Sequence, residues 1–227
     1  MSKILLVEDE ENIRLFTKIN LEREGFEVLE AESGEIGVEL ALKYNPQVVI
    51  LDVMLPGIDG FEVCKILREK LPKIGIIMLT AKTQDVDRIN GLESGTDDYL
   101  SKPFNPVELI LRIKSLIRRL VSIQNSSDLI SIYPFKLDLY SKNFYKDGKE
   151  IELTPTELTI ITIFMSNPGR AFSRNELLNM TWGEEFDGDI KIVDVNIRRL
   201  RAKIEDNSSK PKYIETVWGT GYRWNSN

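Results

Sequence analysis

VVILD, residues 48–52, is an apolar run that ends on one carboxylate, and it decides the fold. An uninterrupted run of this kind is typical of a strand that is buried on both faces of a parallel sheet. The pattern recurs at the start of the chain, where ILLV (4–7) is followed by Glu8 and Asp9. Residues that finish different parallel strands meet at one edge of the sheet, so we expect these acids to lie together.

A lysine is expected to join these acids. Lys102 lies in LSKP (100–103), at the end of a later apolar segment. One acidic strand end would favour a simple loop cap, but two such ends and a lysine favour a binding site. Clustered carboxylates repel one another without a cation, and hard oxygen ligands in a chain without histidine suit Mg²⁺. The cluster therefore predicts a site for Mg²⁺ and a phosphoryl group.

Length and composition favour two modest domains in a reducing environment. A chain of 227 residues exceeds the usual size of a single core. The one cysteine, Cys64, falls in a helical pattern, so we expect it to pack in a core, and no disulfide framework is possible. Without a basic-then-apolar leader or an apolar run of roughly 18 residues, the chain is expected to be soluble and intracellular.

Up to residue 120, short apolar runs alternate with helical patterns. This alternation is typical of βαβ units, and it predicts a doubly wound α/β domain with a five-stranded parallel sheet. The expected strands are 4–7, 26–29, 48–51, 75–79 and 98–100, and the expected helices are 12–24, 34–43, 60–70, 85–94 and 106–119. The last helix has a wide apolar face, because Ile110, Leu111 and Ile117 extend its core stripe. Packing on two sides and a partner surface both remain possible for it.

A polar segment separates this domain from a second one. We place a linker at residues 121–128, where QNSSD is small, polar and without periodicity. The expected domains are therefore 1–120 and 129–227. Four strand patterns within 129–153, with an Asp-Gly turn between two of them, predict an antiparallel sheet at the start of the second domain.

Helices should follow this sheet. One is announced by TPTE (154–157) and one by SRNE (173–176), which has the spacing of a capping box. A third helix is expected over 190–205, followed by two strand-like runs around GTG (219–221). The arrangement of helix, turn, helix and hairpin predicts an α+β winged helix-turn-helix domain.

The charge of the chain is unevenly distributed. The net charge is −6, and residues 1–120 carry 16 basic and 21 acidic residues, whereas residues 190–224 carry eight basic and four acidic ones. A local basic excess inside an acidic protein is a candidate surface for nucleic acid.

On the third helix, an apolar stripe predicts the buried face. The stripe is Val193, Ile197, Leu200 and Ile204, which leaves Val195, Arg198, Arg199 and Ala202 facing away, with Asn196 and Lys203 at the margin. A lone arginine-rich helix is more often a solvated face, but the capped helix before it and the glycine hairpin after it favour docking in the major groove of double-stranded DNA. The predicted DNA contacts are Val195, Asn196, Arg198, Arg199, Arg201, Lys203, Thr216, Thr220 and Arg223.

As a set, these features resemble a two-component response regulator of the OmpR/PhoB winged-helix family, over essentially the whole chain. In the first domain the matching segments are LLVEDE (5–10), ILDVMLPGIDGFEV (50–63), LTA (79–81) and GLESGTDDYLSKPF (91–104). In the second they are LTPTELTII (153–161), VDVNIRRLRAKI (193–204) and TVWGTGYRW (216–224). The family joins a receiver of the CheY-like fold to a DNA-binding domain and works in the bacterial cytoplasm.

The resemblance implies that Asp52 accepts a phosphoryl group from a partner sensor histidine kinase. The implied Mg²⁺ ligands, direct or through water, are Glu8, Asp9, Asp52 and the backbone carbonyl of Met54. Lys102, in a cis peptide bond with the proline after it, would neutralise phosphoryl oxygens, Thr80 would donate its hydroxyl to them, and Tyr99 would turn inward as the switch. Such a protein is modified on its own aspartate and is not a turnover enzyme.

The resemblance also implies that two receivers pair on phosphorylation. The matching residues are Arg88, Ile89, Leu92, Asp97, Asp98, Glu108, Leu111, Arg112 and Arg119. Exposed ion pairs contribute little energy individually, so they would set the register while apolar side chains supply adhesion. The acidic stretch 183–189 corresponds to a loop that can touch RNA polymerase in the family.

Two residues depart from the pattern of the family. Many members have histidine in place of Asn196 and arginine in place of Trp218, and we expect Trp218 to pack against its own hairpin. Two alternatives remain at this point. An aspartate-dependent phosphatase would share the acidic strand ends, but it usually has a second acid where this chain has Met54. A receiver that binds DNA constitutively is disfavoured by the complete set of site residues.

Overall fold

The computed structural model describes residues 2–81, 95–121, 129–184, 186 and 188–225. The backbone divides into two compact units, Met1–Ile117 and Arg118–Asn227, each described by itself. In the described part of the chain, none of the helices is both long and apolar enough to cross a membrane.

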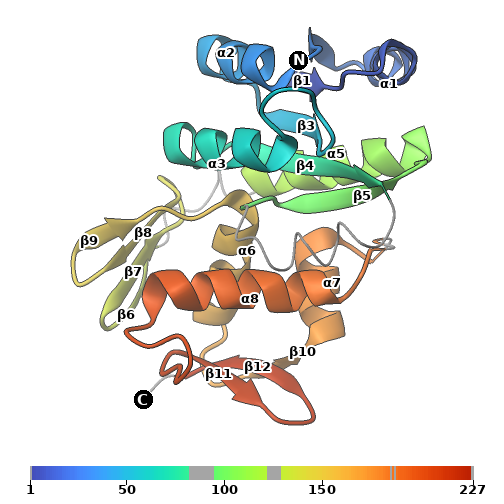
Figure 1. The fold of residues 1–227 in the computed structure, drawn as a ribbon. Helices are drawn as coiled ribbons and strands as arrows, with labels where there is room; N and C mark the ends of the chain where they lie inside the picture. The colour runs from blue at the N-terminus through green and yellow to red at the C-terminus, as the bar shows by residue number, and fades with distance from the viewer. Residues whose placement is uncertain (1, 82–94, 122–128, 185, 187, 226–227) are drawn as a thin grey trace. The chain divides into compact units, whose positions relative to one another are not determined.

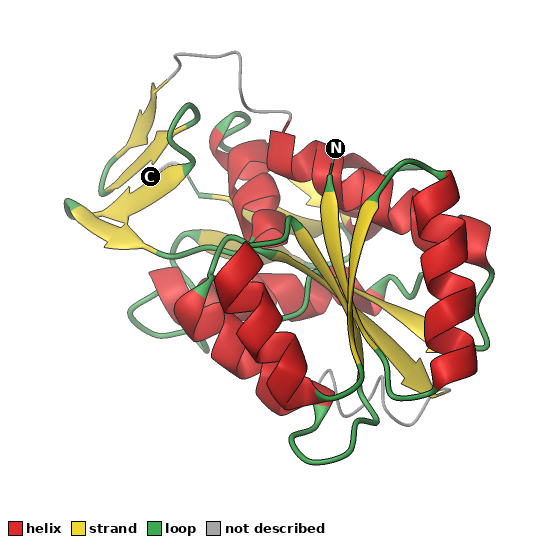
Figure 2. Cartoon of the chain, turned by 90° about the horizontal axis from the view of Figure 1, so that it is seen from above, coloured by secondary structure: helices red, strands yellow, loops and turns green. Residues whose placement is uncertain are grey.

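The first unit is built on a five-stranded parallel sheet with the order β2-β1-β3-β4-β5 (Figure 1). Its strands are β1 (Lys3–Val7), β2 (Glu27–Ala31), β3 (Val48–Asp52), β4 (Gly75–Ala81) and β5 (Asp98–Lys102). Its helices are α1 (Glu11–Arg23), α2 (Gly34–Tyr44), α3 (Gly60–Lys70) and α5 (Pro106–Val121). Figure 2 shows helices on both faces of the twisted sheet, so the predicted doubly wound fold is confirmed. The helix predicted at 85–94 lies outside the described residues.

The central strands form the core of this unit. Every residue of β3 is buried, as the continuous apolar run predicts. β3 pairs with β1 through Val7 and Leu51 and with β4 through Asp52 and Leu79. The strands therefore end together, and their last residues form one edge.

A glycine brings α3 close to that edge. A Cβ atom on Gly60 would lie 2.1 Å from the carbonyl oxygen of Asp52, a distance that no side chain tolerates. Asp59, the residue before it, is the N-cap of α3 and accepts a hydrogen bond from the amide of Glu62. Together, Asp59 and Gly60 place the start of α3 directly beside the end of β3.

The second unit contains two antiparallel sheets and three helices. The first sheet has the order β6-β7-β8-β9 and the second β10-β12-β11. The strands are β6 (Leu129–Ile132), β7 (Phe135–Asp138), β8 (Asn143–Lys146), β9 (Lys149–Ile151), β10 (Ala171–Ser173), β11 (Ile214–Val217) and β12 (Gly221–Trp224). The helices are α6 (Pro155–Met165), α7 (Arg174–Trp182) and α8 (Lys191–Ile204).

The predicted elements of this unit are confirmed, and one strand was missed. Both α6 and α7 begin with a capping box, in which Thr154 and Ser173 are the N-caps. The missed strand, β10, has only three residues and no alternating pattern, and it forms because it pairs with β12 through Phe172 and Tyr222. Such pairing between distant segments cannot be read from local sequence. We call β11, β12 and the turn between them the wing.

Candidate functional site

Lys102 joins two buried carboxylates at the carboxyl edge of the parallel sheet. Its Nζ lies 2.6 Å from Oδ2 of Asp52 and 2.8 Å from Oε2 of Glu8. Glu8 directly follows β1, Asp52 ends β3 and Lys102 ends β5, so three different strands supply the three charges. Both carboxylates are almost completely buried, and the expected cis peptide bond between Lys102 and Pro103 is present.

The acids at this edge fit a divalent cation. Glu8, Asp9 and Asp52 each offer a carboxylate oxygen, and the three oxygens lie within 4.8 Å of one another. Asp9 is exposed whereas the other two are buried, which leaves one side open to solvent. Hard oxygen donors with access to water are what Mg²⁺ prefers, since it retains several water ligands. These residues could therefore hold Mg²⁺.

Three further residues were expected at this edge. The hydroxyl of Thr80 is fully buried, and among the described residues it has no hydrogen-bond partner. Thr80 follows Leu79, the residue of β4 that pairs with Asp52. Tyr99 is a buried residue of β5, and the amide of Met54 donates a hydrogen bond to Oδ1 of Asp52 (3.1 Å). A buried hydroxyl that lacks a partner among the described residues, on the strand beside an acid, is suited to bind an additional anionic group.

Electrostatics distinguish Glu8 from its neighbours. Burial raises the pKa of Glu8 to about 7, the hydrogen bond from Lys102 works in the opposite direction, and the charge of Asp52 raises the pKa further. For Lys102, burial alone would lower the pKa, but the hydrogen bonds and charges of Asp52 and Glu8 outweigh it and raise the pKa. The lysine therefore stays protonated, while Glu8 readily takes up a proton near neutral pH.

The raised pKa of Glu8 predicts a pH-dependent stability. Between its usual value of 4.5 and about 7, folded Glu8 retains a proton that unfolded Glu8 has lost. The free energy of unfolding of the metal-free protein should therefore fall as the pH rises through this window. Urea titrations in chelator at several pH values measure this effect. Glu8→Gln, which cannot titrate, should lack this component, and an equal slope in both proteins would contradict the assignment.

Arg14 is a residue of this site that the sequence did not reveal. Its Nη1 donates to the carbonyl oxygen of Glu8 (2.6 Å) and to that of Asp9 (3.1 Å). The guanidinium thus holds the backbone that carries two acids of the site. An arginine on an amphipathic helix has no sequence signal that separates this role from solvation.

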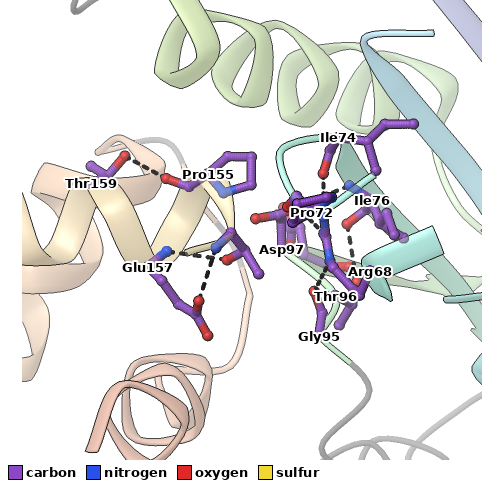
Figure 3. A network of polar contacts seen from close by, with 12 residues as sticks. Arg68, Pro72, Ile74, Ile76, Gly95, Thr96, Asp97, Pro155, Glu157 and Thr159 are labelled. Carbon is purple, nitrogen blue, oxygen red and sulfur yellow. Dashed lines mark hydrogen bonds and ion pairs between the residues drawn. The ribbon is translucent and has the colours of Figure 1, made fainter. Parts of the chain in front are cut away.

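Asp97 does not lie on the surface, although it was expected in an exposed ion pair of a dimer interface. Its side chain is fully buried, and Oδ2 accepts hydrogen bonds from Arg68 Nη2 (2.6 Å) and the amide of Ile76 (2.9 Å) (Figure 3). Arg68 also donates to the backbone carbonyls of Gly95 and Pro72. The carboxylate fastens α3 to the start of β5 within one chain.

Other residues of the expected interface are paired inside the chain. Arg112 Nη1 donates to Asp98 (3.0 Å) and Nη2 to Glu108 (2.6 Å), and the side chains of Arg112 and Asp98 are buried. Leu111 is exposed, whereas Arg119, in the last turn of α5, is buried. The remaining three, Arg88, Ile89 and Leu92, lie outside the described residues.

In the second unit, α8 buries the predicted stripe and exposes only part of the opposite face. Val193, Ile197, Leu200 and Ile204 are buried as predicted, and Arg198 and Ala202 are exposed. Two expectations are wrong, because Arg199 is only 8% exposed and Asn196 is fully buried. Asn196 Nδ2 donates to the carbonyl of Ile192 (2.8 Å), one turn earlier on the same helix. Val195 remains half-buried at the edge of the face.

Several basic residues proposed for DNA are engaged within the protein. Lys203 donates to Glu157 (2.6 Å), and Arg223 donates to Glu215 across the wing (2.8 Å). Arg201 donates to the carbonyl of Ile214 in β11, and burial lowers its pKa. On the wing itself, Thr220 is exposed and Thr216 is half-buried. Among the arginines of α8, Arg198 is therefore the most exposed.

Trp218 corrects another expectation. The residue was expected to pack against its hairpin, but it is 91% exposed at the tip of the wing. The tip is a turn closed by a hydrogen bond from the amide of Thr220 to the carbonyl of Val217, with Gly219 at φ 75°. This positive φ favours glycine, and the turn directs the indole away from the sheet.

Known proteins resemble the chain along its whole length. Residues 4–114 match the response regulator receiver domain, and residues 148–224 match the C-terminal domain of transcriptional regulatory proteins. The transcriptional regulatory protein AfsQ1 of Streptomyces coelicolor is 43% identical, with 98% of both chains covered. SrrA of Staphylococcus aureus is 40% identical, with 98% of this chain and 95% of SrrA covered.

A solved structure agrees with these relatives. DrrB of Thermotoga maritima, described as an OmpR/PhoB homologue, aligns over 99% of both chains with a TM-score of 0.52 and 34% identity. A receiver fold with an acidic edge is therefore followed by a DNA-binding domain in one chain. The protein belongs to the OmpR/PhoB family of two-component response regulators, which act as transcription factors.

Proposed function

We propose that this regulator is switched by phosphorylation of Asp52, with Mg²⁺ bound at the adjacent acids. The observation that carries the proposal is the ion pair of Asp52 and Lys102 at one sheet edge, beside strand β4, where the hydroxyl of Thr80 has no partner among the described residues. A carboxylate can accept a phosphoryl group, and a fixed cation and a buried donor can bind the oxygens of that group once it is attached. The donor would be a phosphohistidine of a partner sensor kinase.

In the proposed reaction, a carboxylate oxygen of Asp52 attacks phosphorus as the bond to the donor nitrogen breaks. Met54 and Lys102 already hydrogen-bond the two oxygens of Asp52 and would hold its carboxylate in orientation. The ammonium of Lys102 would move to a phosphoryl oxygen and neutralise its charge. Bound Mg²⁺, held by Glu8, Asp9, Asp52 and the carbonyl of Met54, would neutralise the remaining phosphoryl charge.

The phosphoryl group would then act on Thr80. Its hydroxyl gains a hydrogen-bond acceptor, which favours a position closer to Asp52. Tyr99, which is already buried, would fill the space behind it. The change would be transmitted to the surface of β5 and α5, where Leu111 is exposed.

A second receiver would bind at this surface. Asp98, Glu108 and Arg112 are paired within the chain, so dimerisation would require them to exchange partners. Because these contacts are already made within the chain, we expect a weak dimer before phosphorylation. Arg88, Ile89, Leu92 and Arg119 complete the proposed set, without Asp97.

Lys102→Ala should separate phosphorylation from dimerisation. The variant keeps Asp52 and its metal acids, so it should still accept a phosphoryl group, but it lacks the cation that couples this group to the fold. Phosphorylated Lys102→Ala is expected to remain a monomer in light scattering. An exposed matched control, Lys65→Ala, should dimerise normally. Normal dimerisation of phosphorylated Lys102→Ala would contradict the role of the lysine.

The DNA-binding surface that we propose consists of α8 and the wing. Its direct contacts are Arg198, Val195, Thr216, Thr220 and Arg223, which would exchange Glu215 for DNA. The buried Arg199 and Asn196 are left out, as are Arg201 and Lys203, which keep their contacts within the protein. The domains that carry the two functions are 1–120 and 129–227, joined by residues 121–128. The acidic loop at 183–189 is proposed to contact RNA polymerase.

Arg198→Ala should weaken DNA binding severely without affecting phosphorylation. The residue is exposed on α8, and a bidentate arginine contact to guanine contributes about 1–3 kcal/mol of discrimination. Fluorescence anisotropy with a duplex selected from a random pool measures the affinity. Lys191→Ala, an exposed residue at the start of α8, is the matched control. Equal affinity of Arg198→Ala and wild type would contradict the proposed surface.

A further inference from the structure

Two side chains from different elements donate to one carboxylate oxygen of a third element in the second unit. The hydroxyl of Tyr222 in β12 donates to Oδ1 of Asp194 in α8 at 2.7 Å. Arg174, the first residue of α7, donates to the same oxygen through Nε at 2.7 Å, and its Nη2 donates to the Tyr222 hydroxyl at 3.2 Å. One oxygen thus links the wing, α7 and α8.

Arg201 adds a second link between α8 and the wing. Its Nε and Nη2 donate to the carbonyl of Ile214 at 3.0 and 2.6 Å, and Nη2 also donates to Oγ1 of Thr216 at 3.0 Å. The guanidinium carbon lies 5.5 Å from the centre of the Tyr222 ring, and that of Arg174 lies 4.9 Å from it. Both arginines are close enough for a cation–π attraction to the ring.

These contacts reach both strands of the wing. Thr216 and Tyr222 are directly opposite each other in the pairing of β11 with β12, and Tyr222 is also opposite Phe172 of β10. Tyr222 is buried, whereas Asp194 and Arg174 are partly exposed. The wing is therefore held by charge-assisted hydrogen bonds to the helix, and these are stronger and more directional than neutral ones.

We propose that Arg201 and Tyr222 are positioning residues that fix the wing relative to α8 and thereby set DNA specificity. Arg201 was expected to contact DNA, but two of its three guanidinium nitrogens already bind the wing. Reading a base sequence requires Arg198 on α8 and Thr220 on the wing to be held at a fixed separation. Sequence-independent phosphate binding tolerates a looser geometry. The proposal rests on the DNA-binding function proposed above.

The test uses the full-length protein and two conservative variants. Tyr222→Phe removes one oxygen and keeps the ring, and Arg201→Lys keeps the charge but cannot form the forked contact to Ile214 and Thr216. The probes are a duplex that wild type selects from a random pool and a shuffled duplex of equal composition. Anisotropy titrations at several salt concentrations give the affinity for each.

For Tyr222→Phe and Arg201→Lys, we expect the affinity ratio between selected and shuffled duplex to fall roughly two- to tenfold. The dependence of affinity on salt should not change, because no phosphate contact is lost, whereas loss of one such contact lowers the slope by about one. In the double variant, the fall in this affinity ratio should be smaller than the product of the two single falls, since both residues act in one network.

Three outcomes would overturn the proposal. An unchanged ratio in Tyr222→Phe would show that the network does not position the wing. If Arg201→Lys relaxes discrimination at one base pair only, or lowers the salt slope, then Arg201 contacts DNA directly. If wild type binds no duplex, the DNA-binding function fails first and the positioning role with it. Tyr222→Phe removes only a hydroxyl group and should fold, so it tests the network even if Arg201→Lys does not fold.

Discussion

Asp52→Asn is expected to abolish phosphorylation completely. The substitution preserves the size of the side chain and can still accept the hydrogen bond from Met54, but an amide cannot attack phosphorus. Asp52 is also the only carboxylate among the described residues that contacts both Lys102 and the amide of Met54. Intact mass spectrometry after incubation with Mg²⁺ and a small acyl phosphate should show one added phosphoryl group in wild type and none in Asp52→Asn.

A matched control is Asp59, the N-cap of the helix that follows β3. Asp59 is exposed and caps α3, and Asp59→Ser retains a capping oxygen. This variant should take up the phosphoryl group as wild type does. Phosphorylation of Asp52→Asn to the level of wild type would place the acceptor elsewhere and contradict the assigned site.

Among the proposed substitutions, Arg68→Met is expected to lower the free energy of unfolding the most. The substitution leaves the fully buried carboxylate of Asp97 without its cation, and breaking a buried pair from one side costs about 3–5 kcal/mol. The backbone carbonyls of Gly95 and Pro72 lose a donor as well (Figure 3). The chain should still fold at low temperature, but its first unit should unfold at a much lower urea concentration.

The positions of the tryptophans make this measurement selective. Trp182, Trp218 and Trp224 all lie in the second unit, so their fluorescence reports on that unit, while far-ultraviolet circular dichroism reports on both. The early transition should therefore appear in circular dichroism only. Lys65→Ala, which is exposed on α3, is the control. Arg68→Met with Asp97→Asn should recover part of the loss, because no unpaired charge remains, and a wild-type midpoint in Arg68→Met alone would refute the argument.

The architecture of the first unit could be predicted because its strands are continuous apolar runs. Burial on both faces leaves no other role for VVIL, and acids that end such strands must meet at one edge. The same argument predicted that Lys102 lies near Glu8 and Asp52, because Lys102 also ends a strand. A strand pattern does not give the distances between these side chains. The hydrogen bonds of Arg14 to two backbone carbonyls could not be predicted, because backbone acceptors carry no sequence signal.

The errors have a common cause. Asp97 was expected in an exposed ion pair because of the resemblance, and Arg199 and Asn196 were placed on or beside the open face of α8 by helical spacing, but each is buried. Asp97 has Arg68 and the amide of Ile76 as partners, and Asn196 donates to a carbonyl on its own helix. Trp218 was expected to pack against its hairpin, yet it is 91% exposed in the turn at the tip of the wing. Burial depends on how the whole chain packs around a residue, and neither the residue type nor the helical spacing at one position reveals that packing.

The central claim is that a phosphoryl group on Asp52 controls self-association. The most direct test is the solution mass of the full-length protein by light scattering, with Mg²⁺, before and after addition of a small acyl phosphate, alongside Asp52→Asn. We predict that wild type changes from monomer to dimer and that Asp52→Asn stays a monomer under both conditions. A wild type whose mass does not change after phosphorylation, or an Asp52→Asn variant that dimerises in response to the donor, would contradict the account.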